Sequence, residues 1–345
     1  MNAIFTAIAA IIIFAVLIFV HELGHFIAAK SLGVKVIEFA LGMGPKIVSK
    51  KRGETIYSLR LVPIGGFCSM EGEDEESENE RSFSKKEPWK RLVILVSGAF
   101  MNILLGFILL VGITSTSEGF VEPQIKEVKT DSAAEKSGLI SGDEIIRVNG
   151  RCVNIIEDFS WEMSNNPNSD GKLNLLVKNG GEKREITVTP ENKNGELIYG
   201  ITLDTEDNSF FKTLRNSFYR TCFYSRVVID SFVNIIRGNI PLSQVSGPVG
   251  IVHEIGTAVE TARETGIEGI ISLIGLAILL TINLGVFNLV PLPALDGGRI
   301  LFVLIEMIRR KPVPVEKEAV VHFIGIVLLL GLSVLIAFKD IFTIW

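Results

Sequence analysis

The pentapeptide His21-Glu22-Leu23-Gly24-His25 contains the residues whose types and spacing could carry chemistry. Residues four apart share one face of a helix, so His21 and His25 can each direct a ring nitrogen at one metal ion. Glu22 can then accept a proton from a water molecule bound to that metal. The alternative is a polar helix end that happens to contain two histidines. The chain has 4 histidines in all, and two of them flank this glutamate, which favours the metal site.

A zinc ion held by two histidines needs a third protein ligand and an open position for water. The extended pattern HExxHxxGxxH is absent, because Ala28 and Ser31 stand at its glycine and third-histidine positions. Glu38 and Glu54 are nearby donors on spacing alone. A more distant candidate is Asp296, the first charged residue after a long apolar run.

The surroundings of Asp296 predict a site wall. Pro291 and Pro293 precede it and prevent a continuous helix. Non-helical backbone at membrane depth is tolerated only where it is buried in protein or lines a wet cavity. The two glycines that follow the aspartate are expected to make this segment flexible. The alternative is that Asp296 only caps a following helix, residues 299–309.

The elements that must position these residues are apolar. Of the 345 residues, 48% are hydrophobic and 21% are charged, with a mean hydropathy of +0.40. A helix needs about 20 apolar residues to cross the hydrocarbon core of a bilayer. Four stretches are long enough, which excludes a purely soluble enzyme: residues 3–20, 92–117, 269–295 and 319–338. The net charge of −5 offers no whole-chain argument for nucleic acid as a partner.

Basic residues predict the orientation in the membrane. The loop of residues 30–91 carries 12 lysines and arginines, and the loop of residues 299–318 carries 5. The positive-inside rule makes both loops cytoplasmic, so both termini and residues 118–268 are expected outside. Within the first loop, residues 71–80 include 7 acidic side chains, for which a solvated loop is favoured over a partner-binding tail. Residues 56–62 and 65–70 are expected to be short strands separated by a turn at Gly65-Gly66.

The outer region divides into two parts. Residues 121–205 predict a small α+β domain, with strands at 121–128 and 144–148, a short helix at 132–136 and a hairpin around the turn Asn179-Gly180-Gly181. Residues 210–237 show helical spacing of apolar side chains. That helix either lies on the membrane surface or packs as an ordinary helix, and the sequence leaves both open.

Four sequence blocks together resemble the site-2 protease family of intramembrane zinc metalloproteases, of the bacterial regulator-of-sigma-E protease type. They are HELGH, IYSLRLVPIGGFCSM, SFSKKEPWKRLVILVSGAFMNILLG and NLVPLPALDGGRILF, and the resemblance covers essentially the whole chain. The block SAAEKSGLISGDEIIRVNG is similar to a bacterial PDZ domain. A GLGF-type carboxylate loop is absent, which argues against binding of a peptide's terminal carboxylate.

The resemblance implies roles for individual residues. His21, His25 and Asp296 match the family's ligands to one zinc ion, and Glu22 matches its catalytic glutamate. His253 and His322 match no metal position and are expected to be packing residues.

The resemblance also implies a place for the substrate. Asn283 and Asn288 match polar positions beside the substrate strand, although each could instead form a hydrogen bond between membrane helices. Residues 65–70, which begin with Gly65 and Gly66, match an edge strand that pairs with the substrate.

The expected fold is a polytopic α-helical membrane protein with four transmembrane segments and an inserted extracytoplasmic α+β PDZ-like domain. The expected divisions are the first transmembrane segment with HELGH (1–29), a cytoplasmic loop (30–91), the second transmembrane segment (92–117), the PDZ-like domain (118–207), an amphipathic helical region (208–268), the broken third segment (269–298), a cytoplasmic loop (299–318) and the fourth segment (319–338).

The implied activity is zinc-dependent cleavage of transmembrane segments in the bacterial cytoplasmic membrane. Its substrates would be single-span membrane proteins that have already been trimmed, such as anti-sigma factors or signal-peptide remnants. Two other classes compete with this enzyme: a catalytically inert membrane-anchored PDZ receptor, and a metal transporter. An incomplete ligand set would favour the receptor, whereas ionisable residues in several apolar segments would favour the transporter.

Overall fold

The computed structural model describes residues 3–73, 75, 77–165, 170–193 and 196–344. The chain forms two compact units: residues 1–109 with 224–345, here called the helical unit, and residues 110–223, here called the sheet unit. The elements that lie in or begin in the helical unit are α1 (Ala3–Ser31), β1 (Val36–Arg52), β2 (Thr55–Met70), α2 (Pro88–Ser115), η1 (Leu242–Gln244), α6 (Pro248–Thr265), α7 (Ile267–Asn288), α8 (Asp296–Arg309) and α9 (Val315–Ile344).

Four helices are long and apolar enough to cross a membrane: α1, α2, α7 and residues 316–343 of α9. The four predicted transmembrane segments are thereby confirmed as helices, and the protein is a membrane protein. Helix α1 does not stop at the end of its apolar run but continues to Ser31, so the whole pentapeptide His21–His25 is helical. This gives the two histidines the shared face that their spacing predicted.

The chain is not helical between α7 and α8, as the two prolines predicted. Helix α7 ends at Asn288 and α8 begins at Asp296, three residues earlier than expected. The N-cap of α8 is Leu295, and Asp296 is the first residue of the helix itself. The arrangement therefore differs from the capping alternative, in which the carboxylate would sit at the cap.

The two glycines after Asp296 are buried, and the expectation that they give flexibility is wrong. A Cβ on Gly297 would overlap the carbonyl of Val290, and a Cβ on Gly298 would lie 2.5 Å from the carbonyl oxygen of Leu292. Glycine is required here because the non-helical segment folds back tightly onto the first turn of α8. Asp296 is thereby held on a closely packed support.

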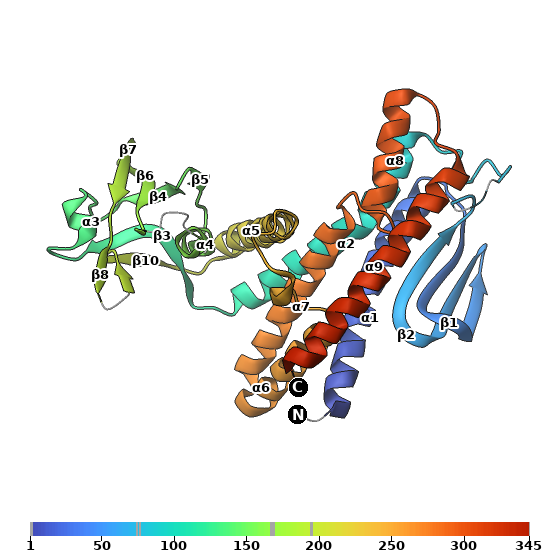
Figure 1. The fold of residues 1–345 in the computed structure, drawn as a ribbon, viewed down its shortest axis with the longest axis horizontal. Coiled ribbons are helices and arrows are strands. Elements are labelled where there is room, and N and C mark those ends of the chain that lie inside the picture. Colours follow the sequence, from blue (N-terminus) through green and yellow to red (C-terminus); the bar gives the residue numbers. More distant parts are fainter. Residues whose placement is uncertain (1–2, 74, 76, 166–169, 194–195, 345) are drawn as a thin grey trace. The chain divides into compact units, whose positions relative to one another are not determined.

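Strands β1 and β2 form a small sheet beside α1 (Figure 1). Residues 38–41 of β1 pair with residues 66–69 of β2 on one side and with residues 56–59 on the other. The turn expected at Gly65-Gly66 is present as a reversal inside β2, where Gly65 has φ +87°. Strand β1 was not predicted. The segment 66–70 has no second strand partner among the described residues and forms one edge of this sheet.

The acidic stretch 71–80 forms two ion pairs near its start. Glu71 pairs with Lys35 at 2.9 Å, and Glu73 pairs with Arg299 at 2.8 Å. The expectation of a purely solvated loop is therefore wrong for these two glutamates, whereas Glu75, Glu78 and Glu80 are exposed. Residues 74 and 76 of the stretch lie outside the described part. Arg299 is on α8, so the loop that follows β2 is bonded to the helix that carries Asp296.

The sheet unit contains β3 (Gly119–Val128), α3 (Ala133–Lys136), β4 (Glu144–Val148), β5 (Arg151–Cys152), α4 (Ile156–Ser164), β6 (Leu173–Asn179), β7 (Glu182–Val188), β8 (Glu191–Lys193), β9 (Glu196–Ile198) and β10 (Ile201–Asp207). Its main sheet has the strand order β10-β3-β4-β6-β7, and β5 pairs with β4. The predicted strands, short helix and hairpin are present. Helix α4 and the edge strand β10 were not predicted.

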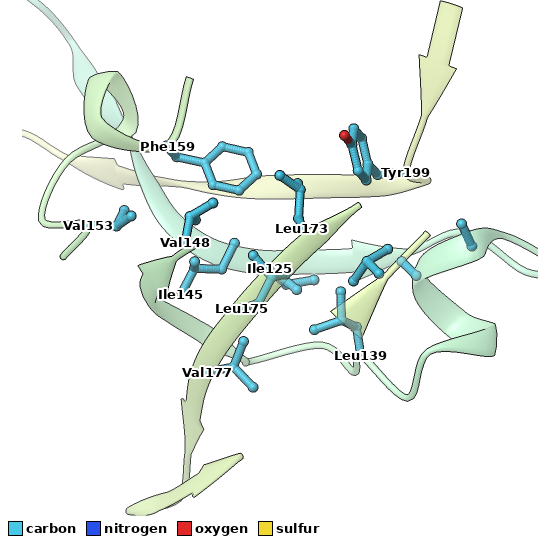
Figure 2. Close-up of a cluster of buried hydrophobic side chains, with 13 residues drawn as sticks. Ile125, Leu139, Ile145, Val148, Val153, Phe159, Leu173, Leu175, Val177 and Tyr199 are labelled. Atoms are coloured by element: carbon cyan, nitrogen blue, oxygen red, sulfur yellow. The ribbon is translucent and has the colours of Figure 1, made fainter. Parts of the chain in front are cut away.

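The core of the sheet unit lies between the sheet and its helices (Figure 2). Figure 2 shows Phe159 of α4 and Tyr199 beside Leu173 of β6. Apolar and polar residues alternate along β6 because Leu173, Leu175 and Val177 all point into this core, and that alternation predicted the hairpin. Helix α5 (Phe210–Ile236) follows β10 and runs from the sheet unit into the helical unit.

Candidate metal centre

His21, His25 and Asp296 converge, although the aspartate lies far from the histidines in sequence. Oδ2 of Asp296 lies 3.1 Å from Nε2 of His21 and 3.3 Å from Nε2 of His25. The two Nε2 atoms are 3.2 Å apart. Both histidines are buried, with exposed fractions of 8% and 6%. Three ligand atoms of the types that zinc prefers therefore form a small triangle in a site largely closed to solvent.

The donor set fits a zinc ion. Tetrahedral zinc with bonds of about 2.0–2.2 Å separates its ligand atoms by about 3.3–3.6 Å, close to the three distances found here. Oδ2 of Asp296 is buried and makes no hydrogen bond in the described structure. A buried carboxylate oxygen is costly without a partner, and a cation between the three donors would supply one. Two neutral imidazoles and one carboxylate also leave a fourth position open, as catalytic zinc sites require.

Helix α2 packs against the face of α1 that carries the histidines. Nδ1 of His25 lies 2.8 Å from the carbonyl oxygen of Ile94 and donates to it, which leaves Nε2 free to bind a metal. Gly98 faces both rings: a Cβ there would overlap Nε2 of His25 and lie 2.9 Å from Cε1 of His21. A Cβ on Gly24 would likewise overlap the carbonyl of Ser97. The two glycines allow the helices to approach closely enough to orient both imidazoles.

Glu22 lies on a different side of α1 from the two histidines. A Cβ on Gly66 would stand 3.5 Å from Cγ of Glu22, and the backbone amide of Cys68 lies within hydrogen-bonding reach of the Glu22 carboxylate. The carboxylate therefore sits beside the edge segment 66–70 of β2. This is the arrangement needed by a proton-transfer group that works next to the metal ligands without being one of them.

The two nearby glutamates that spacing alone allowed as ligands have other partners. Glu38 accepts hydrogen bonds from Ser58 and Arg60 at 2.6 Å and 2.8 Å. Burial would raise the pKa of Glu38, but these bonds and the ammonium group of Lys46 lower the pKa to about 2. The structure thus places Glu38 in an ion-pair network of the β1–β2 sheet.

Glu54 is bound to two cations at the surface of the helical unit. Arg81 makes two hydrogen bonds to its carboxylate at 2.7 Å and 2.8 Å, and Lys30 makes one at 2.6 Å. The bonds from Arg81 and Lys30 lower the pKa of Glu54 to about 2. Neither glutamate belongs to the group of ligand atoms formed by His21, His25 and Asp296.

The expected substrate-binding residues lie on elements that border this centre. Asn288 is the half-buried last residue of α7, at the break before Asp296, and Asn283 is exposed one and a half turns earlier on the same helix. Gly65 and Gly66 lie in the reversal of β2 that leads into the edge segment. Of this group, Gly66 is the residue that the structure places directly against Glu22.

His322 supports the centre from α9, a role that the sequence did not suggest. Its Nδ1 accepts a hydrogen bond of 2.9 Å from the backbone amide of Ala294, a residue with φ +77°. Gly325, one turn later on α9, packs so closely on Pro293 that a Cβ would overlap it. Helix α9 therefore holds the non-helical segment that presents Asp296. A histidine inside an apolar span was the available signal.

Asn102 of α2 was also missed by the sequence reasoning. The residue is fully buried, at 0% exposure, and its side-chain amide nitrogen lies 3.4 Å from Nδ1 of His21. A polar residue near the middle of an apolar span was the signal that could have found it.

Comparisons with known proteins agree with this geometry. The family model described as Peptidase family M50 matches residues 9–332. The Clostridium perfringens protein CPE1693 is 38% identical over 343 residues, covering 97% of this chain and 98% of that protein. Zinc metalloprotease RasP of Geobacillus kaustophilus is 30% identical over 97% of both chains. The regulator of sigma-W protease RasP of Bacillus subtilis is 30% identical over 97% of this chain and 98% of its own. The chain belongs to peptidase family M50, the site-2 protease family of zinc metalloproteases.

Proposed function

We propose that this protease is an intramembrane endopeptidase that cuts transmembrane segments of other membrane proteins. The observation that carries the proposal is the convergence of His21 and His25, on a helix apolar enough to span a membrane, with Asp296 at the break after a second such helix. Ionisable groups at membrane depth are expensive and usually functional. A substrate for this site has to bring its peptide bond into the membrane, and transmembrane segments do so.

The proposed roles follow from the geometry. His21, His25 and Asp296 would hold one zinc ion, which when bound supplies Lewis acidity toward the scissile carbonyl and an attacking water. Glu22, beside these ligands, accepts the proton of the attacking water and passes it to the leaving amine. The complete ligand set together with Glu22 argues against an inert receptor. The long second helix α2 contains no Asp, Glu or His after residue 91, which argues against a transport path.

The edge segment 66–70 of β2 is the proposed docking strand for the substrate. A transmembrane helix hides its peptide bonds in its own hydrogen bonds and must unwind before cleavage. Pairing with a sheet edge replaces those bonds. The edge lies next to Glu22, as the contacts of Gly66 and Cys68 show. Gly65 gives the reversal that exposes this edge, and Asn283 and Asn288 are proposed to hold the extended substrate from α7.

We further propose that both termini and the sheet unit are extracytoplasmic and that the sheet unit is PDZ-like. The basic loops at residues 30–91 and 299–318 support this orientation in a bacterial cytoplasmic membrane. Asn208, two residues before α5, donates to the carbonyls of Thr114, in the last turn of α2, and Ser117, just after that helix, at 2.9 Å each. Helix α5 thus starts at the end of a membrane helix, and its exposed Phe210, Phe211 and Phe218 favour contact with the bilayer surface.

The sheet unit is proposed to refuse single-span substrates that still carry large outer domains and to admit trimmed ones. A unit outside the membrane cannot reach across about 30 Å of hydrocarbon to take part in the chemistry, but it can crowd the entrance. The competing idea is recruitment, in which the unit grips a newly exposed end. A groove suited to that role lies between Phe159 and Met163 of α4 and the edge strand β10.

The test uses the purified full-length protein in lipid vesicles with a single-span model substrate. Chelation of zinc should stop cleavage, and added zinc should restore it. Glu22→Gln should slow cleavage by about 10²–10⁴-fold, which is the usual effect of losing a general base, and should leave zinc bound. Glu316→Gln, at an exposed position in the first turn of α9, is the matched control and should behave as wild type. Wild-type turnover by the Glu22 variant would refute the assignment.

A further inference from the structure

One stripe of α2 faces the two histidines of α1. Ile94, Gly98 and Asn102 are spaced four residues apart and therefore share a face of the helix, as His21 and His25 do on theirs. His25 is oriented by the carbonyl of Ile94, and Gly98 leaves room for both rings. The remaining member of the stripe, Asn102, reaches His21. Each proposed histidine ligand thus meets its own residue of α2 through Nδ1, the nitrogen that faces away from Asp296.

In the contact between Asn102 and His21, one polar atom of the Asn102 amide has no hydrogen-bond partner in the described structure. The amide nitrogen of Asn102 lies 3.4 Å from Nδ1 of His21, whereas its Oδ1 is buried and has no hydrogen-bond partner in the described structure. A histidine that binds a metal through Nε2 carries its proton on Nδ1, and that proton needs an acceptor. Rotation of the side-chain amide by about 180° makes its oxygen and nitrogen exchange places and leaves the shape of the group nearly unchanged. The unpartnered oxygen then faces the imidazole N–H.

We propose that Asn102 is a positioning residue that accepts the Nδ1 proton of His21 and thereby fixes the tautomer and ring orientation that present Nε2 to zinc. The inference rests on the proposed zinc site and adds a residue to its support. An amide is a neutral acceptor, so it orients the ring without adding a second buried negative charge to the site.

Helix α7 packs closely against the backbone around Asn102, and the contact at Gly285 keeps the Asn102 side chain in place. The hydroxyl of Thr281 donates to the carbonyl oxygen of Asn102 at 3.1 Å. One turn later, a Cβ on Gly285 would lie 2.9 Å from the carbonyl oxygen of Ala99 and 3.3 Å from Cβ of Asn102. Close packing by α7 therefore leaves the amide little freedom beyond rotation about its own axis.

The test measures zinc affinity by competition with a chelator, using the full-length protein in detergent. Asn102→Leu fills the same space without an acceptor and should weaken zinc binding about 10–100-fold, the usual effect of removing such an outer partner. Asn102→Asp keeps an acceptor and should retain zinc at least as well as wild type. Thr281→Val is the matched control, because it removes a buried polar contact to Asn102 that does not reach His21, and it should leave zinc affinity unchanged.

A role in packing alone predicts the opposite order. Leucine would then be tolerated, and a buried aspartate would disrupt the fold and with it zinc binding. That order, or an equal loss in Thr281→Val, would overturn the proposal. If Asn102→Leu is not recovered folded, the zinc affinity of Asn102→Asp relative to wild type decides between the two roles.

Absence of zinc from the wild-type protein would instead refute the proposed zinc site, so failure of the zinc site and failure of the proposed role of Asn102 are distinguishable. The ¹⁵N signals of His21 in the zinc-loaded wild type should report a protonated Nδ1.

Discussion

Gly98 and His25 are in direct contact: the α-carbon of the glycine on α2 faces the imidazole on α1 so closely that a methyl group there would overlap Nε2. Nε2 is the nitrogen that lies 3.3 Å from the carboxylate of Asp296. A residue with no chemistry of its own therefore determines whether the ring can face its partner ligand.

Gly98→Ala should lower zinc affinity by at least about 10-fold, because the ring of His25 must turn away from the other ligands to make room. Gly112→Ala on the same helix meets nothing within 4 Å and is the matched control. Metal content and chelator competition of the two purified variants measure the difference. Equal zinc binding by both variants would show that α1 and α2 can separate without loss of the site.

Asp296→Ala should lose both zinc and cleavage, because two imidazoles alone do not complete a catalytic zinc site. An aspartate that served only to stabilise the start of α8 would instead cost about 0.5–2 kcal/mol and leave zinc in place. Metal analysis of the folded variant separates the two. A fully zinc-loaded Asp296→Ala protein would return the carboxylate to a structural role.

Glu38 predicts a pH-dependent contribution to stability. Its folded-state pKa of about 2 is below its usual value of 4.5, so its ion pairs stabilise the folded state above pH 4.5 and are lost as the pH falls toward 2. Glu38→Gln should therefore lower the free energy of unfolding by about 1.5–3 kcal/mol at pH 7, the usual contribution of a hydrogen bond to a charged group. The difference in the free energy of unfolding between Glu38→Gln and wild type should become smaller below pH 4.5.

Thermal unfolding in detergent at several pH values measures this difference in stability. Glu80→Gln, at an exposed position in the loop that follows β2, serves as the control and should unfold like wild type at each pH. A difference between Glu38→Gln and wild type that is the same at pH 7 and pH 3 would contradict the ion-pair account.

Removal of residues 121–205 tests whether the sheet unit filters or recruits. The flanking residues Phe120 and Glu206 are register partners in β3 and β10, so the deletion joins two neighbouring positions. Filtering predicts that the deleted protein keeps zinc and now cuts untrimmed substrates. Recruitment predicts slower cleavage of trimmed substrates, with untrimmed ones still refused. Cleavage rates of both substrate forms by wild type and by the deletion variant decide the matter.

The sequence by itself determined the local features of this protein. The spacing within His21–His25 required only that α1 continue past its apolar run, and the four spans followed from uninterrupted runs of apolar residues. Pro291 and Pro293 specified the break after α7, because a proline beyond the first turn of a helix removes a backbone hydrogen bond and clashes with the preceding turn. The hairpin of β6 and β7 followed from alternation and a turn sequence. These features depend on neighbours within a few residues.

The tertiary structure alone decided which distant groups meet. Spacing left Asp296 equal to a helix cap and left Glu38 and Glu54 open as donors, whereas the family resemblance implied Asp296. Packing of the broken segment against α1 and α9 then brings the Asp296 carboxylate to the two histidines. Asn102 stands out in the sequence as an amide in an apolar helix, but its role could not be assigned there, because that role depends on the residue opposite it. Strand β1 was missed because its pairing depends on β2 reversing around it. Long-range contacts depend on the whole packing arrangement, which no local pattern encodes.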